Sequence, residues 1–385
     1  MSHSQLPSTL HQLLVGATPG DAITDQALLL RRWLREWGVQ SDIFAEHIHP
    51  HLEGDVRPFT QYRSARQPWV IYHHSIGSDM VENLLARSQP IILIYHNVTP
   101  PEFFAQVDPA WTARSARGQA QTAALRAHTI LALADSAYNA QELKKLGYEE
   151  TAVLPITLDT AAYDLPLNSD LVEMLAQKRP LLLFVGRLAP NKRQEDLIKL
   201  LYYYRRIQPQ AHLLLVGDRW VVGYDQWLES LAADWGLADG VTLLGKVSQA
   251  DMVTCYRQAD LYVSMSEHEG FGKPFIESMY LDLPVLAYGA ASVPDTLGAS
   301  GVQFHRKDFE RLAELVDILV TDSALRQRLI AGQRQQLQQF LPETAVQLFR
   351  QQLLTLKKGD DRNSFRGRWR NIIGCLKMCQ SIIKL

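Results

Sequence analysis

The chain has 385 residues, of which 46% are hydrophobic and 21% are charged. This composition is ordinary for a globular protein and excludes a disordered chain, a collagen and a coiled coil, while the length suits two domains. The formal net charge is −2, which argues against a generally basic nucleic-acid-binding protein, so we expect no nucleic-acid partner.

The cysteine content and the first residues indicate a reducing compartment. The chain has three cysteines, an odd number from which no disulfide framework can be built. Residues 1–10 lack the charged-then-apolar pattern of a signal peptide, and the longest apolar runs are too short to cross a bilayer. We therefore expect a cytoplasmic protein.

In the first half of the chain, short apolar runs alternate with helical patterns. Unbroken runs of about five residues are typical of strands that are buried on both faces of a parallel sheet. The predicted strands are 13–16, 41–45, 69–73, 91–96 and 131–134, and the predicted helices are 22–36 and 119–128.

The second half repeats this plan and then becomes helical. Its predicted strands are 181–185, 211–216, 241–244, 261–264 and 285–287, and its predicted helices are 194–207, 224–234 and 274–280. From Asp308 the apolar spacing is helical, with a further helix around 345–356. Two such sets predict an α/β protein with two doubly wound parallel sheets, divided in the polar segment 155–180.

The strongest chemical signal is the segment 264–277, which reads SMSEHEGFGKPFIE. A predicted strand precedes it, two glycines follow, and Pro274 suits the first turn of a helix. Backbone amides at such a turn can hold an anion or a sugar hydroxyl. Glu269 and Glu277 lie eight residues apart, in the loop and one turn inside the helix. A generic strand–turn–helix with solvated glutamates is the alternative.

A second signal is the segment 181–192, which reads LLLFVGRLAPNK. Arg187 follows a buried strand at its carboxyl end, where ligands bind in open α/β sheets, and Lys192 precedes the next helix. A guanidinium and an ammonium together suit a diphosphate. By itself, the segment also fits two solvated loop cations.

In combination, GRLxPxK and EGFGxPxxE resemble glycosyltransferase family 4, whose members are retaining enzymes. Segments 18–34, 95–104 and 134–143 are similar to bacterial members that build surface polysaccharides, and the resemblance covers about residues 10–350. It implies a GT-B fold of two facing Rossmann-like domains. We assign the acceptor-side domain to 1–165, the nucleotide-sugar domain to 166–340 and a helix returning towards the N-terminal domain to 341–363.

The resemblance also implies roles for individual residues. Arg187 and Lys192 would bind the donor diphosphate, and Glu277 would accept hydrogen bonds from the ribose. Glu269 would hold the transferred sugar, and His96, which follows a predicted strand, would lie near the reacting sugar. The other donor-binding positions that it implies are Gly20, Val247, Gly270, Phe271, Gly272 and Lys273.

The sequence gives little reason to expect a metal. His47, His49 and His51 alternate as metal ligands on a strand can, but Pro50 breaks the strand and no carboxylate cluster completes a site. The chain contains no Asp-x-Asp, which argues against the metal-dependent class of glycosyltransferases. We expect no metal and no cofactor. His73 and His74 are candidates for lining an acceptor cleft.

These patterns predict a hexosyltransferase, with mannose the leading hexose. Its donor would be a UDP- or GDP-sugar, and its acceptor a growing, lipid-linked surface glycan such as O-antigen. A GT-B epimerase or phosphorylase and a non-catalytic sugar-nucleotide-binding protein are the alternatives. A nicotinamide-dependent oxidoreductase does not fit, because the first loop, GATPG at 16–20, lacks the G-x-G-x-x-G pattern.

The end of the chain has a composition of its own. Residues 357–385 carry eight basic and two acidic side chains. In 364–385, apolar residues at helical spacing share the segment with arginine and lysine, as in helices that lie in a membrane interface. We expect this tail to bind an anionic membrane and to place the protein at the inner face of the cytoplasmic membrane. Packing on the N-terminal domain is the alternative.

Overall fold

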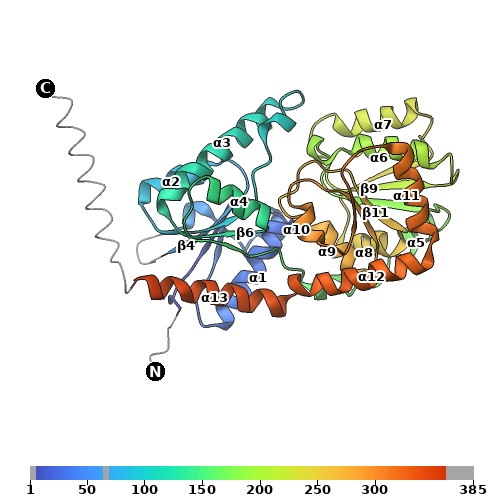
Figure 1. Ribbon diagram of the computed structural model, residues 1–385. Coiled ribbons are helices and arrows are strands. Elements are labelled where there is room, and N and C mark those ends of the chain that lie inside the picture. The colour runs from blue at the N-terminus through green and yellow to red at the C-terminus, as the bar shows by residue number, and fades with distance from the viewer. Residues whose placement is uncertain (1–5, 64–68, 361–385) are drawn as a thin grey trace.

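The computed structural model describes residues 6–63 and 69–360, and shows two α/β domains side by side (Figure 1). Within the described residues, the N-terminal domain has a seven-stranded parallel sheet in the order β3-β2-β1-β4-β5-β6-β7. Its strands are β1 (Gln12–Ala17), β2 (Ile43–Ile48), β3 (Arg57–Pro58), β4 (Val70–His74), β5 (Ile91–Tyr95), β6 (Thr129–Ala134) and β7 (Thr151–Val153). Its helices are α1 (Ala22–Glu36), α2 (Asp79–Arg87), α3 (Pro109–Leu125) and α4 (Ala137–Lys145).

The C-terminal domain repeats this topology in a parallel sheet of six described strands, in the order β10-β9-β8-β11-β12-β13. The strands are β8 (Leu181–Val185), β9 (His212–Val216), β10 (Val241–Gly245), β11 (Leu261–Ser264), β12 (Val285–Tyr288) and β13 (Val302–Phe304). The helices are α5 (Ser169–Ala176), α6 (Gln194–Tyr204), α7 (Tyr224–Asp234), α8 (Gln249–Gln258), α9 (Lys273–Tyr280), α10 (Val293–Leu297), α11 (Phe309–Thr321) and α12 (Ser323–Leu337).

Local chemistry explains where the elements begin. Asp21 accepts hydrogen bonds from the amides of Ile23 and Thr24, so α1 begins at Ala22, where the sequence predicts it. The prediction of a helix over 119–128 was wrong at its start. Asp108 caps Trp111 and Pro109 occupies the first helical position, so α3 begins ten residues earlier.

In each sheet the strand order reverses at one point, between β1 and β4 and between β8 and β11. Loops that leave the carboxyl ends of neighbouring strands in opposite directions open a crevice there, and ligands of doubly wound folds bind in it. Gly20 lies in the loop after β1, and Arg187 lies in the loop after β8. The loop after β1 and the loop after β8 face each other, with Arg187 4.0 Å from Asp21. We call the space between the carboxyl ends of the two sheets the cleft.

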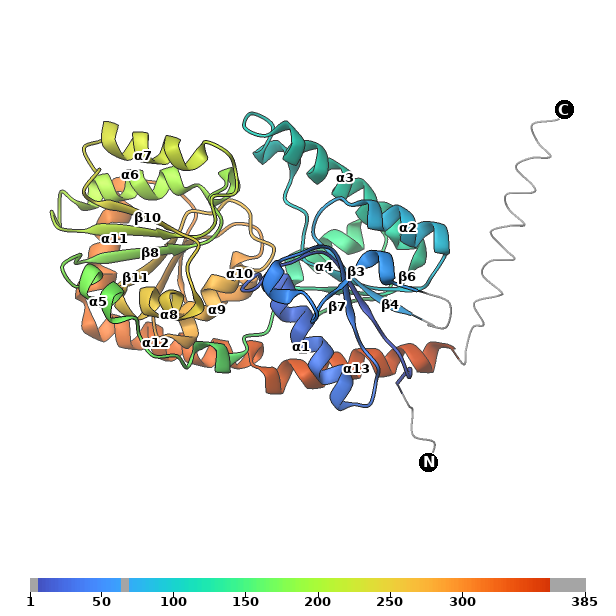
Figure 2. The same cartoon turned by 180° about the vertical axis from the view of Figure 1, so that it is seen from behind.

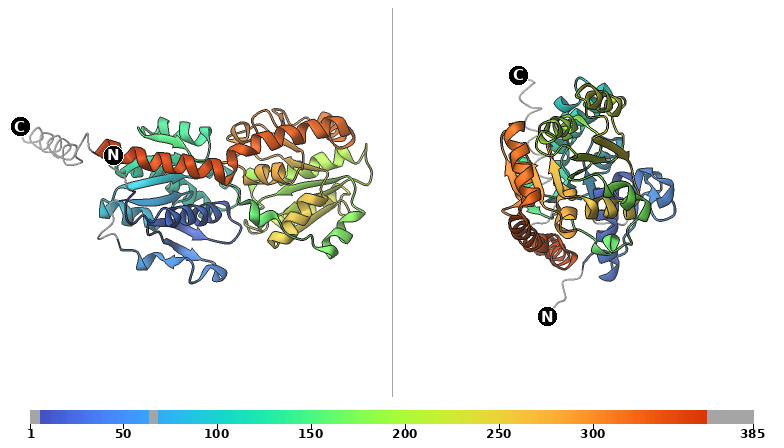
Figure 3. Two further views of the ribbon diagram at one scale, coloured as in Figure 1. Left: turned by 90° about the horizontal axis from the view of Figure 1, so that it is seen from below. Right: turned by 90° about the vertical axis from the view of Figure 1, so that its right-hand side faces the viewer.

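The last described helix, α13 (Pro342–Asp360), returns to the N-terminal domain. It follows α12 along one side of both domains and passes beside α1 (Figures 2 and 3). Ala345, Phe349 and Leu353 are buried in the cluster that contains Leu30 of α1. The proposed membrane tail, residues 364–385, lies outside the described residues. Among residues 6–63 and 69–360, no helix is long and apolar enough to span a membrane.

Candidate functional site

Arg187 lies in the cleft with its hydrogen-bond donors unused. Its side chain is 51% exposed, and its nearest carboxylate oxygen, on Asp21 of the other domain, is 4.0 Å away. Within the described part of the chain, the guanidinium makes no hydrogen bond, although its Cζ lies 4.7 Å from the ring centroid of Trp220. A guanidinium with five free N–H groups, at the point where the strand order reverses, is well placed to bind an anion.

Lys192 and Glu269 form an ion pair in the same region. Lys192 ends the short 3-10 helix Pro190–Lys192, and its Nζ lies 2.6 Å from Glu269 Oε2. The two side chains are only 20% and 12% exposed. The residue predicted to bind the diphosphate and the residue predicted to bind the sugar are therefore in direct contact, although they are 77 residues apart in the sequence.

The loop from Glu269 to Gly272 directs its carbonyl groups away from the position where a ligand is expected. The carbonyl oxygens of residues 269, 270 and 271 accept hydrogen bonds from Ser292, from Ser136 and Asn139, and from Thr296. In a planar trans peptide the N–H points opposite to the C=O. In the described chain no hydrogen bond uses the amides of Gly270, Phe271 or Gly272, so these three donors remain available.

Gly270 also brings the two domains together. A Cβ atom at this position would lie 2.4 Å from the carbonyl oxygen of His96 and 3.0 Å from Cβ of Asn97. Its carbonyl oxygen accepts hydrogen bonds from Ser136 Oγ at 3.1 Å and Asn139 Nδ2 at 3.0 Å. The loop that carries the free amides therefore packs directly against the loop that carries His96.

Glu277 is buried and already hydrogen-bonded on both oxygens. Oε1 accepts from Tyr163 Oη and Oε2 accepts from Tyr256 Oη, both at 2.6 Å. Burial raises the pKa of both tyrosines far above the ordinary value, so both hydroxyls keep their protons and donate them to Glu277. Each carboxylate oxygen can accept a further hydrogen bond. Tyr163 lies in the segment that connects the domains, and no sequence motif singles it out.

Lys273 connects the C-terminal domain to α1. Its Nζ lies 2.6 Å from Asp25 Oδ2 and 3.6 Å from Glu277 Oε1. Burial lowers the pKa of Lys273, but the two carboxylates more than compensate, and the net shift is upward. A cavity of about 210 Å³ opens beside this ion pair. It is lined by Gly20, Asp25, Leu28, Leu29, Arg32, Thr157, Asp159, Ala162, Tyr163, Gln249 and Lys273.

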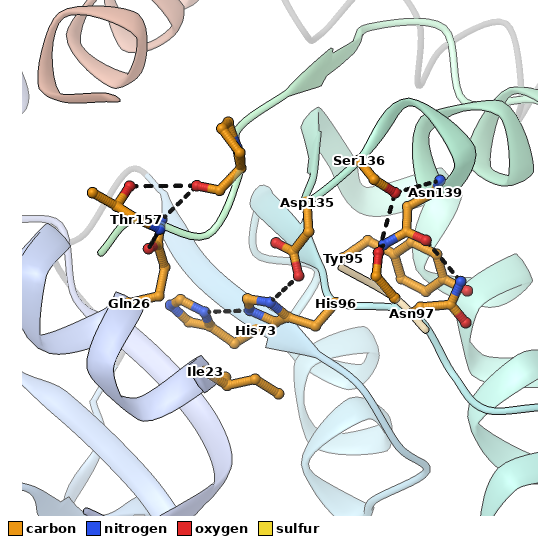
Figure 4. A network of polar contacts seen from close by, with 12 residues as sticks. Ile23, Gln26, His73, Tyr95, His96, Asn97, Asp135, Ser136, Asn139 and Thr157 are labelled. Atoms are coloured by element: carbon orange, nitrogen blue, oxygen red, sulfur yellow. Dashed lines mark hydrogen bonds and ion pairs between the residues drawn. The ribbon is translucent and has the colours of Figure 1, made fainter. Parts of the chain in front are cut away.

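His96 belongs to a buried chain of hydrogen bonds (Figure 4). Its Nδ1 lies 2.7 Å from Asp135 Oδ2, and its Nε2 lies 2.9 Å from His73 Nδ1. His73 Nε2 lies 2.9 Å from Gln12 Oε1, and Gln12 Nε2 donates to the carbonyl oxygen of Ala27 at 2.9 Å. The His96 side chain is only 2% exposed.

The donors and acceptors of this chain fix the position of each proton. A carbonyl can only accept, so Gln12 turns its own oxygen towards His73, whose Nε2 must donate. Burial lowers the pKa of His73 well below the ordinary value, so its Nδ1 is bare and accepts from His96 Nε2. One further proton is then shared between His96 Nδ1 and Asp135. Burial raises the pKa of Asp135, whereas its hydrogen bond with His96 lowers it, and we interpret the pair as a His96 cation bound to an Asp135 carboxylate.

The remaining predicted residues lie in less direct positions. Val247 is in the loop after β10 and packs partly against the core of the C-terminal domain. His74 is fully buried and contacts Thr122 Oγ1 at 2.9 Å, so the prediction that it lines a cleft was wrong. His51 donates its amide to His49, and no group of three or more metal-ligating side chains occurs among the described residues.

Sequence reasoning also missed a histidine inside its own strongest motif. His268 precedes Glu269, and its Nε2 is buried without a hydrogen-bond partner. Burial and the nearby Lys192 lower its pKa to about 4, so this imidazole is neutral at pH 7. Its ring centroid lies 6.0 Å from that of Phe103, in the N-terminal domain.

Part of the C-terminal domain is similar to a known family. Residues 172–336 match the model of the glycosyl transferases group 1 family. A D-inositol 3-phosphate glycosyltransferase from Stackebrandtia nassauensis is 31% identical over 157 residues, which is 39% of this chain and 35% of that protein. A GDP-mannose-dependent monoacylated alpha-(1-6)-phosphatidylinositol monomannoside mannosyltransferase from Corynebacterium glutamicum is 29% identical over 163 residues, 40% of this chain and 42% of that protein. The matches thus span well under half of these relatives.

Solved structures match nearly the whole chain at low identity. Anabaena Alr3699/HepE, in complex with UDP and glucose, has a TM-score of 0.72 and 19% identity, covering 90% of this chain and all of that one. WaaG, a glycosyltransferase involved in lipopolysaccharide biosynthesis, has a TM-score of 0.67 and 16% identity, covering 88% and 99%. The predicted GT-B fold is confirmed, and the family match supports the predicted resemblance to glycosyltransferase family 4.

The hydrogen-bond chain around His96 makes a spectroscopic prediction. In the wild-type protein, both ring nitrogens of His96 should carry a proton at pH 7, because Asp135 accepts from one and His73 from the other. In Asp135→Asn the neutral amide can donate to Nδ1, so His96 should lose one proton. Nitrogen-15 NMR of histidine-labelled protein reads both states. His51→Gln, at an exposed position, identifies an unrelated signal as the control, and an unchanged His96 signal in Asp135→Asn would refute the assignment.

Proposed function

We propose that this chain, in which residues 172–336 match the glycosyl transferases group 1 family and the two domains form a GT-B fold, is a retaining hexosyltransferase. Its donor is a UDP- or GDP-hexose. Its acceptor is a growing surface glycan linked to a lipid, as in O-antigen synthesis. Relatives whose names include GDP-mannose-dependent mannosyltransferases, and fold neighbours in complex with UDP and glucose, support this choice of donors, with mannose the leading hexose.

The guanidinium of Arg187 is the observation that carries the proposal, because it makes no hydrogen bond within the described chain and its ion pair with Asp21 is long, at 4.0 Å. When a glycosidic bond to a nucleoside diphosphate breaks, negative charge accumulates on the leaving phosphate, and a cation already in place stabilises that charge. Arg187 supplies the free cation, and Lys192 the second. Gly20 lies across the cleft. It has no side chain to keep the phosphates from the backbone, and its φ of +80° is a conformation that glycine adopts readily.

The other site residues hold the donor. The free amides of residues 270–272 and the Glu269 carboxylate bind the transferred hexose, the amide of Lys273 completes this set, and Glu277 binds the ribose. The loop that contains Val247 holds the base. His96 fixes the edge of the sugar site nearest the N-terminal domain. Both of its ring nitrogens are occupied, so it acts by position and charge, and it does not remove a proton.

The proposed retention rests on the resemblance to glycosyltransferase family 4, and the site groups are compatible with it. Glu269 is paired with Lys192, which leaves it a weak nucleophile. We therefore propose attack of the acceptor hydroxyl from the face that the diphosphate leaves, with the leaving phosphate taking the hydroxyl proton. An epimerase, a phosphorylase or a non-catalytic binding protein with the same fold would not transfer the hexose from the nucleotide sugar to another glycan, so transfer, or donor hydrolysis without acceptor, separates these alternatives.

Arg187→Ala and Lys192→Ala should each lower kcat about a hundredfold or more, because each removes a charge that stabilises the leaving diphosphate. Steady-state kinetics with the best donor from a screen of UDP-, GDP- and ADP-sugars gives the measurement. Arg311→Ala, at a side chain that is 84% exposed, is the matched control and should leave kcat unchanged. Near-wild-type kcat in both site variants would contradict the diphosphate assignment.

We also propose that transfer needs no metal or other cofactor, since the sequence has no Asp-x-Asp and two cations already serve the diphosphate. Transfer should therefore persist after dialysis against EDTA, with an initial rate within about twofold of that in Mg²⁺. A rate that falls to background and returns with Mg²⁺ or Mn²⁺ would show that a metal stabilises the leaving group.

Residues 364–385, outside the described structure, are proposed to bind anionic lipid at the inner face of the cytoplasmic membrane. Each basic residue near an anionic surface contributes about 1 kcal/mol, so several of them together with apolar residues suffice for reversible binding. Truncation after Asn363 should abolish cosedimentation with phosphatidylglycerol vesicles and leave the thermal midpoint unchanged. Neutral phosphatidylcholine vesicles are the control. If the truncated protein instead loses several degrees of thermal stability, the tail packs on the domain.

A further inference from the structure

An aromatic cluster, formed by Phe104, Trp111 and Trp220, crosses the cleft beside Arg187. Phe104 and Trp111 come from the N-terminal domain, where Phe104 precedes α3 and Trp111 lies in its first turn. Trp220 comes from the loop between β9 and α7 of the C-terminal domain. The ring centroids of Trp111 and Trp220 are 3.9 Å apart, and those of Phe104 and Trp220 are 5.8 Å apart. This contact requires the two domains to be close together.

Trp220 also contacts the Arg187 guanidinium through its ring. The 4.7 Å separation between Arg187 Cζ and the indole centroid is within the range of a cation–π interaction. A ring contact uses none of the five N–H donors, so it places the guanidinium without competing with an anion. A carboxylate partner would instead neutralise the charge and occupy donors, and the carboxylate of Asp21 remains 4.0 Å away.

The backbone holds the two loops in register. Beyond the ends of β8 and β9, Leu188 N donates to the carbonyl oxygen of Asp218 at 2.9 Å, which continues the strand pairing into the loops. A Cβ atom on Gly217 would lie 2.0 Å from the carbonyl oxygen of Gly186, so the two backbone segments approach each other as closely as glycine allows. Arg187 and Trp220 therefore emerge side by side from a paired backbone.

We propose that Trp220 is a positioning residue for Arg187, and that the contact of Trp220 with Trp111 makes this positioning depend on closure of the cleft. The inference rests on the proposed function, in which Arg187 binds the leaving diphosphate. In the closed protein, Trp111 fixes the Trp220 ring, and the ring fixes the guanidinium. When the domains separate, Trp220 loses its N-terminal partners and Arg187 loses its fixed place, so the diphosphate is stabilised only in the closed state.

A double-mutant cycle tests the proposal with the full-length protein. Trp220→Leu removes the π face and keeps an apolar side chain, and it should lower kcat about tenfold, the range of one cation–π contact. Trp220→Phe keeps a π face and should restore kcat to within about threefold of wild type. Trp111→Ala should also lower kcat severalfold. Trp227→Ala, at a 47% exposed tryptophan of α7, is the matched control and should have no effect.

The decisive measurement repeats these variants in the Arg187→Ala background. If the tryptophans act through Arg187, Trp220→Leu and Trp111→Ala cause no further loss there, because coupled residues are not additive. An equal loss of kcat in both backgrounds overturns the inference, as does equal activity of Trp220→Leu and Trp220→Phe. The Arg187→Ala variant by itself tests the proposed function, because a wild-type kcat in that variant would exclude the role of Arg187 in binding the diphosphate. Thermal midpoints within a degree of wild type show that each variant is folded.

Discussion

The contact of Gly270 with the N-terminal domain is the constraint on which the rest of the site depends. Ser136 and Asn139 bind the carbonyl oxygen of Gly270, and the carbonyl oxygen of His96 lies where a side chain at 270 would begin. A larger residue would force the loops apart, so the absence of one Cβ sets the width of the cleft. The same carbonyl contacts turn the amides of residues 270–272 towards the ligand side. One glycine thus sets both the distance between the domains and the direction of the donors.

The cations of the cleft are not equivalent. Lys192 is paired with Glu269 and Lys273 with Asp25, at 2.6 Å each, whereas Arg187 lies over the ring of Trp220 and its carboxylate partner, Asp21, is 4.0 Å away. A cation that is already paired must give up its carboxylate before it can serve a diphosphate fully, and that exchange offsets part of the gain. Arg187 needs no exchange. The largest stabilisation of a leaving diphosphate therefore comes from the cation with the fewest partners.

The sequence was informative wherever a signal is local. Unbroken apolar runs located ten of the thirteen described strands, and a cap residue placed the start of α1. The strands that were not predicted, β3, β7 and β13, have two or three residues each, are mostly half-buried or exposed and lie at or next to sheet edges, so they lack an apolar run. Arg187, Lys192 and Glu269 could be singled out as candidates because their motifs are short. Asp135 and Trp220 were not, since each matters through a partner that is distant in sequence.

The partnership between His96 and Asp135 shows what a sequence motif leaves open. His96 could be singled out by its place after a strand, yet its chemistry depends on residues from three other segments, at positions 12, 73 and 135. A histidine with one free nitrogen could serve as a base. Here Asp135 and His73 occupy both nitrogens in a buried setting, and a bare Nδ1 on His73 demands a proton from its neighbour. A histidine at the same place in a strand order can therefore be a base or a fixed cation, depending on which residues hydrogen-bond to its two ring nitrogens.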